Sequence, residues 1–146
     1  MNRRQIQLGF ILILLGLFTG FAIPELKSPR LTLAAHNVAI TSGLILIALG
    51  ALARSFTLGA RGMAVMMWTW AYAAYANWFA CLLGGITGAS RLTPIAGAGT
   101  TGDALSEAVV SFLLLSLSVA AVVGTALAVW GLRAPSASRV PESVLT

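Results

Sequence analysis

Residues 108–132, AVVSFLLLSLSVAAVVGTALAVWGL, carry no charged side chain and are apolar along almost their whole length. A helix needs about 20 mostly apolar residues to cross the hydrocarbon core of a bilayer. Outward from this stretch, the chain has three more uncharged stretches of comparable length, at 5–24, 31–53 and 62–90. None alternates between apolar and polar residues as a strand does, so each predicts a membrane-spanning helix.

The composition points to the same fold class. The chain has 146 residues, of which 58% are hydrophobic and 9% charged, whereas soluble domains are about 45–50% apolar. We predict an all-α membrane protein whose domain, at 1–132, is a four-transmembrane-helix bundle. The expected spans are about 5–24, 31–53, 62–88 and 105–132. The Pro- and Ser-containing residues 133–146 predict a disordered cytoplasmic tail.

Basic residues near the ends of the spans predict the orientation. In a four-span arrangement one side receives six arginines and the other receives three basic residues; the first set is Arg3, Arg4, Arg54, Arg61, Arg133 and Arg139, and the second is Lys27, Arg30 and Arg91. The positive-inside rule places the first set, and with it both termini, in the cytoplasm. We therefore expect a multi-pass protein of a bacterial-type cytoplasmic (inner) membrane. The net charge of +5 reflects topology and contact with the lipid bilayer, and does not indicate a nucleic-acid partner.

Three other interpretations of the sequence are disfavoured. The first apolar stretch is too long for a signal-peptide core and lacks a cleavage site before Pro24. Cys81 is the only cysteine, which excludes an intrachain disulfide. Gly97, Gly99 and Gly102 formally match G-x-G-x-x-G, but a dinucleotide site requires a strand before the glycines. We interpret them as a flexible loop between the third and fourth spans.

Ionisable and amide side chains inside a membrane segment are candidates for function because they are costly to bury there. His36 lies about one turn into the second span, Asn77 lies well inside the third, and Glu107 lies in the first turn of the fourth. All three are expected in the outer half of the bundle, on different helices. They can therefore face one cavity.

Each of these candidates also has a structural interpretation. His36, the only histidine, can bond a carbonyl or a lipid headgroup, or it can supply one axial bond to a haem iron. Glu107 can act in a site or merely favour the helix dipole, with Asp103 as the N-cap. The third span is rich in aromatic residues; Tyr75 and Trp78 either pack in the core or line, with Asn77, a pocket for an aromatic ligand.

Several short segments resemble one family. They are SPRL at 28–31, LAAH at 33–36, Ser42-Gly43, ANW at 76–78, PIAG at 94–97 and EAVV at 107–110. In this order they resemble the hydroxylaminobenzene mutase family over nearly the whole chain. The chain is more distantly similar to styrene oxide isomerases, small four-helix membrane enzymes that are active as trimers with haem b between subunits.

The resemblance implies a set of roles. His36 would be the axial ligand of a ferric haem b, and hence the metal-binding residue of a homotrimer with haem between its subunits. Asn77 and Glu107 would be catalytic, and the substrate pocket would include Ser42, Tyr75, Trp78 and Cys81. Styrene oxide isomerases carry asparagine where this chain has Ser42, and tyrosine where it has Cys81. These two departures argue against epoxide isomerisation.

The resemblance thus predicts a membrane isomerase, or mutase, that rearranges hydroxylaminobenzene-type arylhydroxylamines to 2-aminophenols, with ferric haem as Lewis acid. A styrene-oxide-type epoxide isomerase is the closest alternative. A small proton-coupled transporter of aromatic compounds, using Glu107, is a second. A haem electron carrier or sensor is a third, which the single histidine disfavours unless subunits share ligands.

Overall fold

The structure, a computed structural model, describes residues 1–133. Its four long helices are α1 (Arg3–Phe21), α2 (Pro29–Ala51), α3 (Ala60–Thr87) and α5 (Ala104–Gly131). Short helical turns lie in the connections: η1 (Ile23–Glu25), η2 (Leu52–Arg54) and α4 (Pro94–Gly97). The part of the chain that is described contains no strand, which confirms the all-α prediction. The predicted tail, apart from Arg133, lies outside the described residues.

Local signals set the helix boundaries close to the ends of the apolar stretches. Pro29 occupies the first turn of α2, where the missing N–H of proline removes no helical bond. Asp103 precedes α5 as its N-cap, and its carboxylate accepts from the backbone N–H groups of Leu105 and Ser106, both at 3.0 Å. The hydrogen bond from the Ser106 hydroxyl holds the pKa of Asp103 below its usual value. Gly88, at φ +83°, ends α3 in the left-handed conformation that favours glycine.

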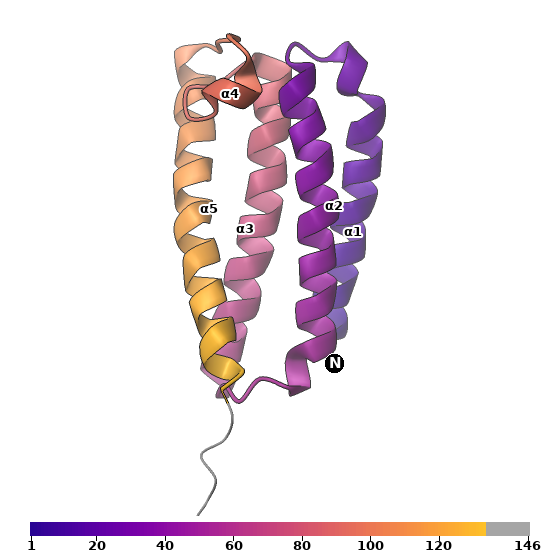
Figure 1. Cartoon of the computed structure of the whole chain (residues 1–146), viewed down its shortest axis with the longest axis vertical. Coiled ribbons are helices and arrows are strands. Elements are labelled where there is room, and N and C mark those ends of the chain that lie inside the picture. The colour runs from indigo at the N-terminus through magenta and orange to yellow at the C-terminus, as the bar shows by residue number, and fades with distance from the viewer. Residues whose placement is uncertain (134–146) are drawn as a thin grey trace, which may run out of the picture.

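The long helices form a row, in the order α5, α3, α2, α1 from left to right in Figure 1. α5 packs on α3, α3 packs on α2, and α2 packs on α1, while α1 also reaches α3. The N-terminus and the end of α5 lie at the same end of the bundle, together with the α2–α3 connection (Figure 1). The loop containing α4 lies at the opposite end, which we call the outer end.

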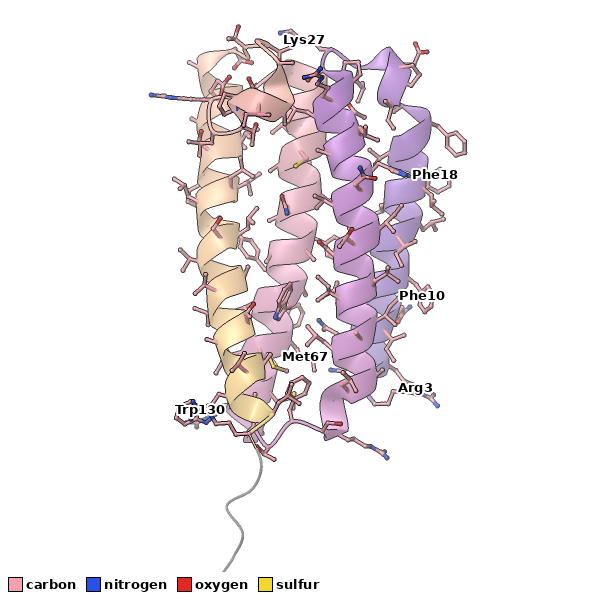
Figure 2. The ribbon with its side chains drawn as sticks, in the orientation of Figure 1. Arg3, Phe10, Phe18, Lys27, Met67 and Trp130 are labelled. Carbon is pink, nitrogen blue, oxygen red and sulfur yellow. The ribbon has the colours of Figure 1, made fainter. Side chains whose placement is uncertain are left out.

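The contact between α1 and α2 depends on glycines. A Cβ atom built on Gly9 would lie 2.5 Å from the Gly43 carbonyl oxygen, and one built on Gly43 would lie 2.7 Å from the Gly9 carbonyl oxygen. The two backbones approach this closely only because both side chains are absent, as at small-residue contacts between membrane helices. On the other face of α1, Phe10 and Phe18 point away from the bundle (Figure 2) and are 60% and 62% exposed.

Three helical segments are long and apolar enough to cross a membrane: Arg3–Phe21, Pro29–Arg54 and Ala104–Gly131. The helix α3, of 28 residues, is not among them. Its Trp, Tyr and Asn side chains lower the mean hydropathy because each carries a polar group. Several of these groups are bonded inside the protein, as described below, so their polarity does not require contact with water.

Candidate functional site

His36 lies on α2 and turns its ring toward α1. Its Nδ1 lies 2.8 Å from the carbonyl oxygen of Gly16. A carbonyl oxygen only accepts hydrogen bonds, so this contact requires a proton on Nδ1, and in the neutral ring the lone pair is then on Nε2. Within residues 1–133, Nε2 has no hydrogen-bond partner. Metal-binding histidines typically donate their second ring nitrogen in this way, often to a backbone carbonyl.

This arrangement fits the requirement of a haem for one axial ligand. No group of three or more His, Cys, Asp or Glu side chains that could hold a bare metal ion occurs in the described part of the chain. A porphyrin supplies four nitrogen ligands of its own, so its iron needs only one imidazole from the chain. In such a site His36 would offer Nε2, since Nδ1 is already engaged with Gly16.

Ser42 and Asn77 lie on the facing sides of α2 and α3. Leu31 of α2 touches Gly84 of α3. Ser42 follows Leu31 by about three helical turns, and Asn77 precedes Gly84 by about two. Cys81 is four residues before Gly85, which touches Thr32 of α2, so the two positions share one face of α3. The Cys81 Sγ lies 3.7 Å from the Oδ1 of Asn77, one turn away. The Nδ2 of Asn77 and the hydroxyl of Ser42 make no hydrogen bond within residues 1–133, and both residues are half-buried. These two groups are therefore free to bind a ligand.

Tyr75 and Trp78, predicted to line the substrate pocket, tie α3 to α1. The Tyr75 hydroxyl donates to the carbonyl oxygen of Leu8 at 2.8 Å. The Trp78 indole N–H donates to the Thr19 hydroxyl at 3.0 Å. Both rings pack against a core cluster whose buried members are Leu12, Ala39, Leu46 and Ala74. These contacts favour the packing interpretation of the two aromatic residues, because their donors are already paired inside the chain.

Trp70 and Trp78 give a matched pair of substitutions. The indole N–H of Trp70 is buried without a hydrogen-bond partner, whereas that of Trp78 is paired. Trp78→Phe should lose a hydrogen bond worth about 0.5–1.5 kcal/mol, while Trp70→Phe removes an unsatisfied donor. We expect Trp78→Phe to be the less stable variant by about 1 kcal/mol or more in denaturant unfolding of the detergent-solubilised protein. Equal losses for the two variants would contradict this assignment.

Glu107 holds the outer loop rather than meeting His36. Its carboxylate accepts from the backbone N–H groups of Ser90 (3.0 Å), Arg91 (3.0 Å) and Gly102 (3.1 Å). From the opposite side, Lys27 donates to the carbonyl oxygens of Thr87 and Thr101, at 2.8 and 3.0 Å. The structure thus does not bring His36 and Glu107 together: His36 bonds α1, and Glu107 bonds the loop before its own helix. These contacts favour a structural role for Glu107.

Glu107→Gln should therefore loosen the outer loop. An amide has one acceptor oxygen and introduces two donors beside three backbone donors, so we expect a loss of about 1–3 kcal/mol in stability. Faster protease cleavage between residues 88 and 103, with a lowered melting temperature, would show it. Glu25→Gln is the matched control, because Glu25 lies at the same end and its side chain has no bond within residues 1–133. Similar effects of the two variants would contradict the role of Glu107.

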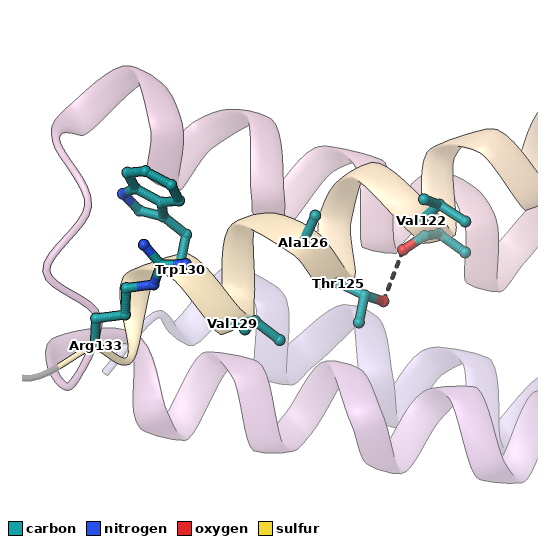
Figure 3. A pocket seen from close by; sticks show the side chains of 7 residues that line it. Val122, Thr125, Ala126, Val129, Trp130 and Arg133 are labelled. Carbon is teal, nitrogen blue, oxygen red and sulfur yellow. Dashed lines mark hydrogen bonds between the residues drawn. The ribbon is translucent and has the colours of Figure 1, made fainter.

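Three surface cavities lie away from His36. One, of about 560 Å³, runs along α5 (Figure 3), where the guanidinium of Arg133 stacks on the Trp130 ring at 4.2 Å. A second, of about 590 Å³, lies between α1 and α3 near the N-terminus and includes Arg4 and Met67. A third, of about 450 Å³, lies under the outer loop and includes Glu107. None of the three includes Ser42, Asn77 or Cys81.

The sequence interpretation missed the residues on α1 that support His36. Gly16 supplies the hydrogen-bond acceptor, and a Cβ atom on Gly20 would lie 2.9 Å from the Nδ1 of His36. The available signal was the spacing of Gly9, Gly16 and Gly20, which puts all three on one side of α1. That spacing indicates a helix contact but does not tell which helix, or which side chain, fills the space.

The chain has relatives of known reaction type. The family model described as styrene oxide isomerase matches residues 1–133. Hydroxylaminobenzene mutase HabB of Ectopseudomonas oleovorans is 44% identical over 138 residues, which are 94% of this chain and 84% of that protein. Hydroxylaminobenzene mutase HabA of the same organism is 39% identical over 110 residues, 75% of this chain and 82% of that protein. No solved structure matches the chain significantly.

Proposed function

This chain belongs to the styrene oxide isomerase family and is an isomerase or mutase, and we propose that it rearranges hydroxylaminobenzene-type arylhydroxylamines to 2-aminophenols. The 44% identity to a hydroxylaminobenzene mutase over 94% of the chain carries the proposal. In this reaction the N–O bond breaks, a C–O bond forms at the ortho carbon, and the proton that leaves this carbon is matched by one gained at nitrogen. Substrate and product have the same composition, so no external oxidant or reductant is needed.

The proposed cofactor is ferric haem b, held by the Nε2 of His36. The hydrogen bond between Nδ1 and the Gly16 carbonyl supports this, because it fixes the ring while leaving Nε2 free. When bound, ferric haem supplies a Lewis acid that stabilises the charge developing on a substrate heteroatom. The contribution of His36 is to hold the group in place; it does not itself transfer a proton in this proposal.

Asn77 and Ser42 are the groups proposed to orient the substrate. The Asn77 Nδ2 can donate to the hydroxylamine oxygen, and the Ser42 hydroxyl can donate or accept, since neither group is engaged within residues 1–133. Cys81 stands beside Asn77 and contributes a small side chain to the same surface. Since the carboxylate of Glu107 is occupied by three N–H groups, we assign it no proton transfer.

The active form is proposed to be a homotrimer with haem between subunits. Within one chain, the ring of His36 turns toward α1, whereas Asn77 and Cys81 lie on the side of α3 that meets α2 through Gly84 and Gly85. In the trimer, the surface of one subunit that carries Asn77 and Cys81 would lie opposite the His36 of its neighbour. One ligand per chain and an incomplete site in each chain both support assembly.

The proposed topology has four spans with both ends in the cytoplasm of a bacterial-type inner membrane. The three apolar helices support it. α3 packs between α2 and α5 and is as long as α5, so it would cross with them. The N-terminus and the end of α5 share one end of the bundle (Figure 1), and that end carries Arg3, Arg4 and Arg133.

The substrate decides between the two reactions of the family. Membranes containing the protein are offered hydroxylaminobenzene or styrene oxide, and the products are separated by chromatography. We expect 2-aminophenol from the first and little conversion of the second, because this chain has Ser42 and Cys81 where styrene oxide isomerases carry asparagine and tyrosine. The family description itself favours the epoxide reaction as second candidate. Phenylacetaldehyde as the dominant product would establish that candidate and refute the first.

A further inference from the structure

The surroundings of His36 on α1 deepen the proposed function, on which this inference rests. We infer that Gly20 and Gly16 are positioning residues: by lacking side chains they hold the imidazole of His36 in the tautomer with a proton on Nδ1. Nε2 is thereby kept as the free electron-pair donor toward the haem iron. Neither glycine touches the substrate or the iron in this proposal; both act through His36.

The acceptor of the His36 hydrogen bond is an oxygen that a side chain would ordinarily cover. The Gly16 carbonyl lies within a helix, where such oxygens are ordinarily covered by the side chain one turn later, since helical side chains lean back over the preceding turn. The residue one turn later is Gly20, which has no side chain. The Gly16 oxygen is therefore open, and the His36 Nδ1 reaches it at 2.8 Å.

The ring of His36 lies against the position that a side chain on Gly20 would take. A Cβ atom on Gly20 would lie 2.9 Å from Nδ1 and 3.1 Å from Cε1 of the His36 ring. A larger residue at this position must therefore displace the ring or separate the two helices, and either change disturbs the bond to the Gly16 carbonyl. At Gly16, a Cβ atom would lie 2.7 Å from the Cβ atom of Ala39. The glycine there lets α1 and α2 approach closely enough for the hydrogen bond to form.

The hydrogen bond to Gly16 determines which nitrogen of His36 is available to a metal. A backbone carbonyl cannot donate, so this contact requires a proton on Nδ1 and excludes the tautomer with a proton on Nε2. A hydrogen bond from the other ring nitrogen of a metal-binding histidine also orients the ring and raises the basicity of the ligating nitrogen. Their loss typically lowers metal affinity by about 10–100-fold. Gly20 would thus influence haem retention without being a ligand.

The test uses the fact that His36 is the only histidine in the chain. Protein labelled with ¹⁵N-histidine gives one imidazole spectrum, which reports the tautomer in the haem-free protein. We expect Nδ1 to be protonated and Nε2 unprotonated in the wild type, and this pattern to be lost in Gly20→Ala. In the haem-loaded protein, transfer of haem to excess apomyoglobin should be about 10–100-fold faster for Gly20→Ala.

Gly124→Ala is the matched control. Its Cβ atom would lie 2.7 Å from the Trp70 ring, so it makes a similar clash with an aromatic side chain at the α3–α5 contact, far from His36. We expect its tautomer and its haem transfer to match the wild type. Equal effects of both glycine substitutions on the tautomer would overturn the assignment to Gly20.

Other outcomes separate the two proposals. A wild-type spectrum with the proton on Nε2 overturns the positioning role, even if Gly20→Ala fails to fold. Unchanged tautomer and haem transfer in a folded Gly20→Ala protein overturn it as well. If the wild type shows the Nδ1 proton, Gly20→Ala loses it, and no haem binds to either protein, the positioning of His36 stands and the haem proposal fails.

Discussion

Replacing His36 with alanine is expected to abolish the Soret absorption of the purified protein and to lower 2-aminophenol formation by about 100-fold or more. His36 offers the one imidazole of the chain, and its Nε2 is free. Lewis-acid stabilisation of a reacting heteroatom is worth several kcal/mol, and each 1.4 kcal/mol or so is tenfold in rate. The effect is measured by the haem content per chain, the absorption spectrum, and the rate of 2-aminophenol formation from hydroxylaminobenzene.

Asn37→Ala is the control for this experiment. Asn37 is the next residue on α2 and is exposed, and its side chain makes no hydrogen bond within residues 1–133; the Thr41 hydroxyl donates only to its backbone carbonyl. Its spectrum and turnover should match the wild type. Free imidazole should restore part of the absorption of His36→Ala by filling the space left by the ring. A His36→Ala protein that retains full haem and turnover would show that another residue is the ligand.

The largest effect on stability is expected for Gly9→Ala. The added Cβ atom would meet the Gly43 carbonyl oxygen at 2.5 Å and the Ile47 Cγ1 atom at 2.6 Å. Since the first neighbour is backbone, α1 and α2 must separate, and overpacking of this kind costs about 1–3 kcal/mol or more. The melting temperature of the detergent-solubilised protein should fall by roughly 5 °C or more.

Gly62→Ala provides the opposite expectation from the same chemical change. Gly62 lies within α3, and the nearest heavy atom to its added Cβ is the Leu58 Cβ at 3.6 Å, an ordinary contact. Gly62 is the third residue of the helix, and replacing a helical glycine without a clash should stabilise the protein by up to about 0.5–1 kcal/mol. If both variants lose stability equally, close approach at Gly9 is not what limits the α1–α2 contact.

Residue types and their order predicted the helices of this protein. The uncharged stretches at 5–24, 31–53, 62–90 and 108–132 correspond to the four long helices. Such stretches are local properties, because a backbone in lipid must satisfy its hydrogen bonds within the same helix. The N-cap role of Asp103 was predicted for the same reason: the capping bonds join it to residues two and three positions later.

Resemblance, rather than periodicity, predicted the reaction. The chain is 44% and 39% identical to two hydroxylaminobenzene mutases over 138 and 110 residues, which supports the resemblance. Spacing alone reached only a polar, aromatic-lined site in the outer half of the bundle. It left open whether Tyr75, Trp78 and Glu107 serve that site or the packing of the chain, and the hydrogen bonds favour packing for all three.

Only the tertiary structure decided which groups meet. The partner of His36 is a carbonyl 20 positions earlier, and the partner of Trp78 is a hydroxyl 59 positions earlier. Helical spacing tells which residues share a face, but these helices are apolar on most sides, so it does not tell which face turns toward which neighbour. The rotation of each helix is fixed by close approach at sites such as Gly9 and Gly20, a property of two helices together.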